Sequence, residues 1–134
     1  VKDLDFGNGL LIVRNGKGEK DRTTLLPTSL HAEIKERLLS VKRVHEQDLA
    51  AGLGDVYMAH ALDRKYPNAG REWCWQYVFP AENVALDPRS GKVRRHHIGG
   101  QSVQRAVKKA IREAGIAKSA SVHTLRHSFA THLL

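Results

Sequence analysis

A lysine between two glycines, Gly16-Lys17-Gly18, stands in the polar stretch formed by residues 15–21. Glycine permits a tight loop and lets a ligand approach the backbone closely. A lysine ammonium on such a loop can bind a phosphate or donate a proton to it. The stretch is not a Walker phosphate loop, which requires Gly-x-x-x-x-Gly-Lys-Ser/Thr followed by a helix. Lys17 is therefore either a phosphate-handling group or an ordinary solvated loop lysine.

Two further residues that can handle phosphate, His123 and Arg126, lie three positions apart where apolar periodicity predicts the start of a helix. This spacing places both side chains on one helical face, while Leu125 turns to the core. The free backbone N–H groups of a helix N-terminus add the positive end of a dipole. A guanidinium, an imidazole and free amides together suit a phosphate in a displacement reaction. The alternative is a capping histidine beside an exposed arginine.

The pair His123 and His127 also raises the possibility of a metal site. A metalloprotease helix requires Glu directly after the first histidine, and Thr124 stands at that position. No carboxylate lies nearby to complete a zinc site. The sequence therefore predicts no metal site.

Charge is distributed unevenly along the chain. Lys and Arg number 22 against 14 Asp and Glu, which gives a net charge of +8. Residues 1–83 hold 12 basic and 12 acidic side chains, whereas residues 84–134 hold 10 basic and 2 acidic ones. Such asymmetry indicates either a surface that faces a polyanion, with nucleic acid the leading candidate, or a solvated basic face. Arg94 and Arg95 are the candidate phosphate contacts, and His96 and His97 beside them face phosphate, base or solvent.

Aromatic residues gather before this basic segment. Trp73, Trp75 and Tyr77 recur at a period of two, which predicts one side of a strand. Aromatic rings beside basic residues can stack unpaired bases, or they can pack a small satellite core.

A length of 134 residues suggests that a single domain positions these residues. The predicted fold class is α+β, with a three-stranded antiparallel sheet followed by mostly helical segments. No apolar run approaches the about 18 residues that a membrane span needs. The single cysteine, Cys74, excludes an internal disulfide. The predicted strands are 1–6, 10–14 and 22–26, and the predicted helices are 28–51 (capped by Thr28), a shorter one within 55–66, 101–114 and 124–134.

Several of these segments together resemble the catalytic domain of the tyrosine recombinases, the phage integrase family. They are residues 1–6, the lysine hairpin 12–22 and the run His-Thr-Leu-Arg-His-Ser-Phe-Ala-Thr-His-Leu-Leu at 123–134. Residues 62–73 and 87–97 resemble the integron integrase subgroup. The resemblance implies that residues 1–134 are a partial catalytic domain, with an integron-type insertion at approximately residues 55–80.

The resemblance also implies a reaction and roles for three residues. Family members join DNA without metal or nucleotide cofactor, through attack of a tyrosine on the scissile phosphate and a 3′-phosphotyrosine intermediate. Lys17 matches the general acid for the leaving 5′ oxygen, His123 the histidine that assists proton transfer, and Arg126 a phosphate-binding arginine. The nucleophilic tyrosine is expected after residue 134 and another catalytic arginine before residue 1, so this chain alone is expected to be inactive.

The subgroup resemblance further implies particular partners. In that subgroup the insertion and nearby segments hold bases extruded from a folded single-stranded site, and Trp75, Pro88, His96 and His97 are the candidates for this role. The expected partners are folded single-stranded and duplex recombination sites, bound by a homo-tetramer of the whole enzyme in the bacterial cytoplasm, with no membrane. The alternative function is a stand-alone basic nucleic-acid-binding module without catalysis.

Overall fold

The computed structural model describes residues 1–16 and 18–132. The chain divides into two compact units, unit 1 at Val1–His97 and unit 2 at Ile98–Leu134. Unit 1 contains all the strands of the described residues and two α-helices, while the described part of unit 2 is helical. The predicted α+β class, a small antiparallel sheet followed by mostly helical segments, is confirmed.

The sheet of unit 1 is a three-stranded meander. Strands β1 (Leu4–Asp5), β2 (Leu10–Val13) and β3 (Arg22–Leu25) lie in the order β1-β2-β3, and both pairs are antiparallel. The apolar run of β2 favours the central position, because β-branched and apolar side chains suit a strand with neighbours on both sides. The three strands were predicted from sequence, and the structure shortens each of them by one or more residues.

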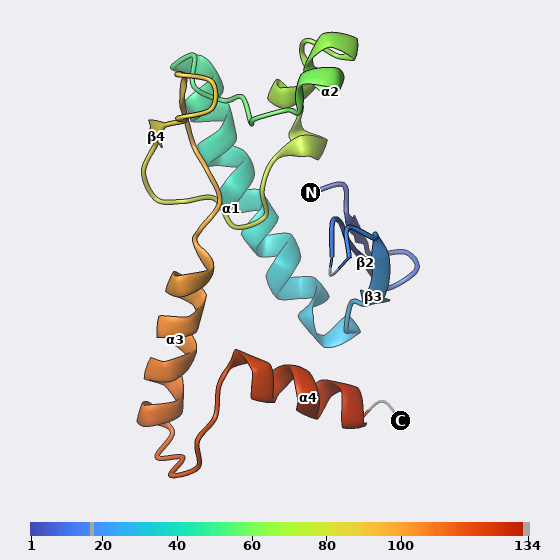
Figure 1. Cartoon of the computed structure of the whole chain (residues 1–134), viewed down its shortest axis with the longest axis vertical. Coiled ribbons are helices and arrows are strands. Elements are labelled where there is room, and N and C mark those ends of the chain that lie inside the picture. The colour runs from blue at the N-terminus through green and yellow to red at the C-terminus, as the bar shows by residue number, and fades with distance from the viewer. Residues whose placement is uncertain (17, 133–134) are drawn as a thin grey trace. The chain divides into compact units, whose positions relative to one another are not determined.

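Helix α1 (His31–Ala50) follows the sheet, after a 3₁₀ turn at Thr28–Leu30. In Figure 1 the sheet lies beside the N-terminal half of α1, and α2 (His60–Lys65) lies near its C-terminal half. The prediction that Thr28 caps this helix is wrong, because the 3₁₀ turn satisfies the first backbone groups and no side chain caps α1. The helix ends before Gly52, whose φ of 75° is the left-handed conformation that glycine adopts readily.

The segment between α1 and the second hairpin packs a small core of its own. Val56, Met58 and Ala69 are buried, and Trp75 and Tyr77 pack against them. The backbone passes close here: Val56 N–H donates to the carbonyl of Gly70 at 2.9 Å, and a Cβ at Gly70 would lie 2.8 Å from Val56 O. Glycine is therefore the residue that fits at position 70.

The aromatic segment is not a strand, so that prediction is wrong. Residues Ala69–Arg71 and Trp73–Trp75 form two short 3₁₀ turns. Buried Gln76 stabilises them, because its side-chain amide donates to the carbonyls of Gly70 at 2.9 Å and Glu72 at 3.1 Å. A hydrogen-bonding side chain of this kind offers the backbone an alternative to a sheet ladder.

A second, two-stranded sheet completes unit 1. Strands β4 (Ala85–Leu86) and β5 (Val93–Arg94) pair antiparallel, with Ala85 opposite Arg94 and Leu86 opposite Val93. The six-residue connection between them, Asp87–Lys92, is called the β4–β5 loop below. The sequence Asp-Pro-Arg-Ser-Gly predicts a turn at this position, and the structure confirms it.

Unit 2 contains helices α3 (Gly100–Glu113) and α4 (Val122–His132). Helix α3 ends before Gly115, whose φ is 65°, as its sequence position predicts. Neither helix has a buried residue, and Leu125 and Phe129 on α4 are exposed. Among the described residues, no helix is long and apolar enough to cross a membrane.

Candidate active site and nucleic-acid interface

The predicted phosphate-handling pair lies at the beginning of α4. Ser121 and Thr124 define this end reciprocally: Thr124 N–H donates to Ser121 Oγ at 3.4 Å, and Ser121 N–H donates to Thr124 Oγ1 at 3.2 Å. The helix therefore begins at Val122, two residues before the predicted start. His123 lies in the first turn and Arg126 one turn later, and both side chains are exposed. The helix N-terminus thus carries an imidazole and a guanidinium on one face, a set that can contact phosphate oxygens.

His123 has a partner on its own helix. The Nε2 atoms of His123 and His127 lie 3.0 Å apart, and their rings meet edge to face with centroids 4.5 Å apart. One Nε2 must donate and the other accept, so at least one imidazole is neutral while this hydrogen bond holds. The described residues contain no group of three or more side chains that could hold a metal ion.

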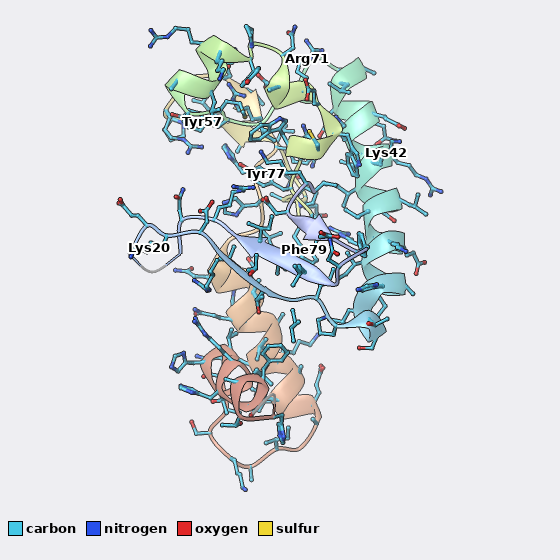
Figure 2. The ribbon with its side chains drawn as sticks, turned by 90° about the vertical axis from the view of Figure 1, so that its right-hand side faces the viewer. Lys20, Lys42, Tyr57, Arg71, Tyr77 and Phe79 are labelled. Carbon is cyan, nitrogen blue, oxygen red and sulfur yellow. The ribbon has the colours of Figure 1, made fainter. Side chains whose placement is uncertain are left out.

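Lys17 lies outside the described residues, but the loop that carries it is described on both sides. Gly16 N–H donates to the carbonyl of Lys20 at 3.1 Å, and Glu19, at a φ of 57°, donates back to the carbonyl of Gly16 at 2.9 Å. Figure 2 shows Lys20 on this loop, which projects from the sheet. The loop belongs to unit 1, whereas His123 and Arg126 belong to unit 2. Convergence of the three residues on one phosphate stays a prediction.

Arg94 and Arg95, the predicted phosphate contacts, are engaged within unit 1. Arg94 is buried, and its Nη1 lies 2.9 Å from Asp55 Oδ2 and donates to the carbonyl of Val56 at 2.9 Å. Arg95 forms a two-pronged pair with Asp48 of α1, at 2.6 Å and 2.9 Å. The largest influence on the Arg95 guanidinium is this hydrogen bond to Asp48, which raises its pKa. These contacts hold β5 to α1 and to the segment after it; a DNA contact by either arginine stays a prediction.

The four residues predicted to hold extruded bases all lie in unit 1, at three places: the second 3₁₀ turn, the β4–β5 loop and the residues after β5. Trp75 is partly buried against the small core, and Lys2 Nζ lies over its ring. Pro88 is exposed on the β4–β5 loop, which is the geometry that a base contact would need. His96 is partly buried, and its carbonyl accepts from Ala81 N–H at 2.6 Å. Exposed His97 meets the Tyr77 ring edge to face at 5.2 Å.

Tyr77 lies between the small core and His97. Its ring packs against the small core, and desolvation by burial is the largest influence on its hydroxyl and raises its pKa. A tyrosine with a raised pKa is less readily ionised and is a poorer nucleophile. Tyr77 is therefore placed as a packing residue.

Sequence reasoning missed several residues that shape this region. Asp87 is fully buried although it lies in a turn, and three donors of the same loop surround its carboxylate. An aspartate at the first position of a turn is a known signal for such hydrogen bonding to residues two positions on, and it could have been used here. Asp48, which lies in α1 far from its partner along the chain, gave no local signal. The missed residues are Asp48, Asp55, Tyr57, Asp87 and Arg89.

Comparison with known proteins gives a consistent result. The model of the phage integrase family matches residues 1–134. Proteins described as integrase/recombinase from Escherichia coli and Pseudomonas aeruginosa are each 52% identical over all 134 residues. A tyrosine recombinase XerA from Pyrococcus furiosus is 30% identical over the same length. The chain spans 40% of the length of the first two relatives and 33% of the third. With its meander, its lysine loop and the His-x-x-Arg motif on α4, the chain belongs to the phage integrase family of tyrosine recombinases.

Proposed function

We propose that this chain is part of the catalytic domain of a site-specific recombinase that cuts and rejoins DNA through a 3′-phosphotyrosine intermediate. The family match across residues 1–134 carries the proposal. The exposed pair His123 and Arg126 on α4 supports it, because these groups suit a phosphodiester in displacement. The integrase/recombinase relatives extend well beyond the matched region, so the activity belongs to the longer protein.

Three residues divide the chemistry in this proposal. A tyrosine hydroxyl from outside residues 1–134 loses its proton, with His123 assisting, and its oxygen attacks phosphorus. The bond to the 5′ oxygen breaks, and Lys17 gives that leaving oxygen a proton. Arg126 donates two parallel N–H bonds to the non-bridging oxygens, where negative charge accumulates. His123 assists the proton transfers, and its bond to His127 fixes the orientation of its ring. No step uses a cofactor or a metal.

The division between Lys17 and Arg126 is tested in the longer recombinase that contains this chain. Lys17→Ala should slow cleavage by about 10²–10⁴-fold, the usual range for loss of a general acid. A 5′-bridging phosphorothiolate has a leaving group that needs no proton, so it should rescue Lys17→Ala. It should not rescue Arg126→Ala. Lys20→Ala, on the same loop, is the matched control and should cleave both substrates normally.

These measurements test the roles of Lys17 and Arg126 separately from the proposed recombinase activity. Rescue of both variants, or of neither, would contradict the separate roles of Lys17 and Arg126. Absence of a covalent protein–DNA adduct from the longer unsubstituted protein would contradict recombination itself. Cleavage should also continue in the presence of EDTA, because the proposed reaction uses no metal.

We also propose that the recombinase is of the integron type and acts on folded single-stranded sites as well as duplex. Residues 55–80, the proposed insertion, have their own core and are tied to β5 by the bond from Arg94 to the carbonyl of Val56. Trp75, Pro88, His96 and His97 are the proposed base contacts, with Arg94 and Arg95 as proposed contacts to phosphate. Exposure of Pro88 and His97 supports this assignment for those two residues.

The subgroup proposal is tested with two DNA hairpins, one with an unpaired extrahelical base and one without it. The longer recombinase should prefer the first hairpin, and Pro88→Ala and His97→Ala should reduce that preference. Equal affinity for the two hairpins would contradict the integron assignment and leave the family assignment intact. The proposed homo-tetramer, acting in the bacterial cytoplasm, would be detected as a four-protomer complex on site DNA by sedimentation.

A further inference from the structure

The β4–β5 loop has a defined shape. Asp87 N–H donates to the carbonyl of Lys92 at 2.8 Å, and Gly91 N–H donates to the carbonyl of Asp87 at 2.7 Å. Gly91 has a φ of 67°, which suits the turn back into β5. The backbone therefore closes the loop at both of its ends.

Asp87 organises this loop from inside. Its carboxylate is fully buried and accepts from Arg89 N–H at 3.1 Å, Arg89 Nε at 3.0 Å and Ser90 Oγ at 3.1 Å. Arg94 Nε lies 3.7 Å from Asp87 Oδ2 and places a second positive charge beside the carboxylate. The buried carboxylate is thus satisfied, and it fixes one edge of the Arg89 guanidinium.

Arg89 is held on a second side by an aromatic ring. Its guanidinium carbon lies 3.9 Å from the centroid of the Tyr57 ring, within the range of a cation–π contact. Tyr57 lies in the part of unit 1 around α2, above the sheet in Figure 2. The Arg89 side chain nevertheless remains 53% exposed. Two contacts thus restrict an arginine that would otherwise be a mobile surface side chain.

The end of this guanidinium remains available. The described contacts of Arg89 use its Nε edge and one face, and none of them uses Nη1 or Nη2. These two nitrogens present parallel donors, the arrangement that matches two oxygens of a phosphate. Holding the fork in advance lowers the entropy lost when it binds.

The charge of the loop favours an anion at its exposed end. Asp87, the loop's carboxylate, is turned inward, whereas Arg89 and Lys92 are exposed. Asp55 pairs with Arg94 and so does not oppose Arg89 directly. The largest influence on the Arg89 pKa is the hydrogen bond to Asp87, which raises it, so the guanidinium stays charged. The loop thus presents positive charge to solvent.

We propose that Arg89 is a pre-positioned binding site for a backbone phosphate of DNA, with Nη1 and Nη2 each donating to one non-bridging oxygen. The site deepens the proposed function, because it rests on DNA being the substrate. It also differs from the proposed contacts Arg94 and Arg95, which pair with Asp55 and Asp48 inside unit 1. In this site Asp87 and Tyr57 position the side chain of Arg89, and Arg89 binds the phosphate.

The test measures DNA affinity of the 134-residue chain by fluorescence anisotropy across a range of salt concentrations. Each phosphate contact adds about 0.9 to the log–log salt slope on duplex and about 0.7 on single strands. Arg89→Ala should reduce the slope by that amount and weaken binding about fivefold to tenfold near 0.1 M salt. Arg43→Ala on α1 removes the same charge from another exposed position and should leave both quantities unchanged.

Two further variants distinguish a positioned fork from simple charge. Arg89→Lys keeps the charge and should keep the slope, but it should weaken binding because the fork is lost. Tyr57→Leu should weaken binding only when Arg89 is present, since the ring acts through the arginine. A side-chain NMR signal of Arg89 that shifts when a short oligonucleotide is added provides a measurement that needs no substitution.

The outcomes separate this inference from the proposed function. If the unsubstituted chain binds with a salt-dependent affinity, and Arg89→Ala behaves like Arg43→Ala, the Arg89 site is wrong and DNA binding stands. If the unsubstituted chain does not bind DNA at any salt concentration, both the site and the proposed substrate are wrong.

Discussion

Unit 1 and unit 2 hold their candidate functional residues in different ways. In unit 1 the candidate base and phosphate contacts are fixed by a buried core and by ion pairs such as Asp48–Arg95, whose partners are 47 positions apart. In unit 2, His123 and Arg126 are fixed by local features, namely the Ser121–Thr124 cap and the His123–His127 bond. The described ion pair of unit 2, Lys109–Glu113, is exposed and spans one helical turn. Long-range contacts therefore hold the candidate recognition residues of unit 1, and local contacts hold the candidate catalytic residues of unit 2.

The test with the largest expected effect shortens one apolar side chain in each unit, a buried one in unit 1 and an exposed one in unit 2. Met58→Ala in the small core of unit 1 should lower the free energy of unfolding by about 2–5 kcal/mol, the usual cost of such a cavity. Val103→Ala on the exposed surface of α3 should change it by no more than about 0.5 kcal/mol. Urea unfolding followed by tryptophan fluorescence and by circular dichroism measures both. Equal changes in the free energy of unfolding would mean that unit 1 depends no more on a buried core than unit 2 does.

The Asp48–Arg95 pair provides the second test. Its side chains are only 12% and 19% exposed, and its two hydrogen bonds involve charged groups, so Asp48→Asn should cost about 2–3 kcal/mol. A double-mutant cycle with Arg95→Gln should give a clear coupling energy. The exposed pair Lys109–Glu113 is the control and should couple by no more than about 0.5 kcal/mol. A coupling near zero for Asp48 and Arg95 would show that their contact does not hold β5.

Acid should affect unit 1 before unit 2. Burial is the largest influence on the Asp87 pKa and raises it, but the hydrogen bonds from Arg89 and Ser90 together lower it below its ordinary value. Hydrogen bonds from Asn8, the side-chain bond first, also lower the pKa of Asp5. The stability from these groups is present above the ordinary aspartate pKa of about 4 and is lost as pH falls through the folded value.

This acid transition can be followed separately in each unit. Tryptophan fluorescence reports unit 1, where both tryptophans lie, and helical circular dichroism includes unit 2, whose sequence carries Glu113 as its one acidic side chain. The fluorescence transition should begin at a higher pH than the loss of the remaining helix. Asp87→Asn should remove part of the pH dependence, and an unchanged acid profile would contradict the role of Asp87.

Two matched glycines give the smallest effect. Gly52 after α1 and Gly115 after α3 both have a positive φ, and an added Cβ would meet nothing within 4 Å at either position. Alanine at each should therefore cost about 1–2 kcal/mol through backbone strain alone. In unit 1 this cost should appear as a lower urea midpoint, and in unit 2 as faster amide exchange at the end of α3. A similar change in the urea midpoint for Gly52→Ala and Gly115→Ala would contradict the proposed difference between the two units.

Sequence reasoning succeeded where the determinants are local. The alternating and apolar runs predicted all three strands of the meander, and the glycines at 52 and 115 predicted the ends of α1 and α3. The prediction failed for Trp73–Tyr77, because the side chain of Gln76 stabilises 3₁₀ turns that compete with a strand. The start of α1 was placed too early, because a 3₁₀ turn precedes it.

The helix that carries His123 and Arg126 was predictable, whereas the contacts of the candidate site residues were predictable only in part. His123 and Arg126 share a face of α4 as their spacing predicts, since helical geometry is set by nearby residues. Arg94 and Arg95 were predicted to be phosphate contacts from the local composition. Their acidic partners lie far back along the chain, so a local pattern cannot show that the charges are already paired. For the same reason, the sequence did not show that the Tyr57 ring contacts the Arg89 guanidinium.

The long-range contacts of unit 1 also have a kinetic consequence. The contacts of Arg95 with Asp48 and of Arg94 with Val56 join residues 47 and 38 positions apart. Such contacts stabilise the chain only after a long loop has closed, and loop closure costs entropy. A region rich in them therefore folds slowly. Helices α3 and α4 need only local contacts, and helix formation takes about a microsecond or less. The helix that carries His123 and Arg126, the candidate catalytic pair, should therefore form early, and the β5 region that contains Arg94 and Arg95 should be assembled last.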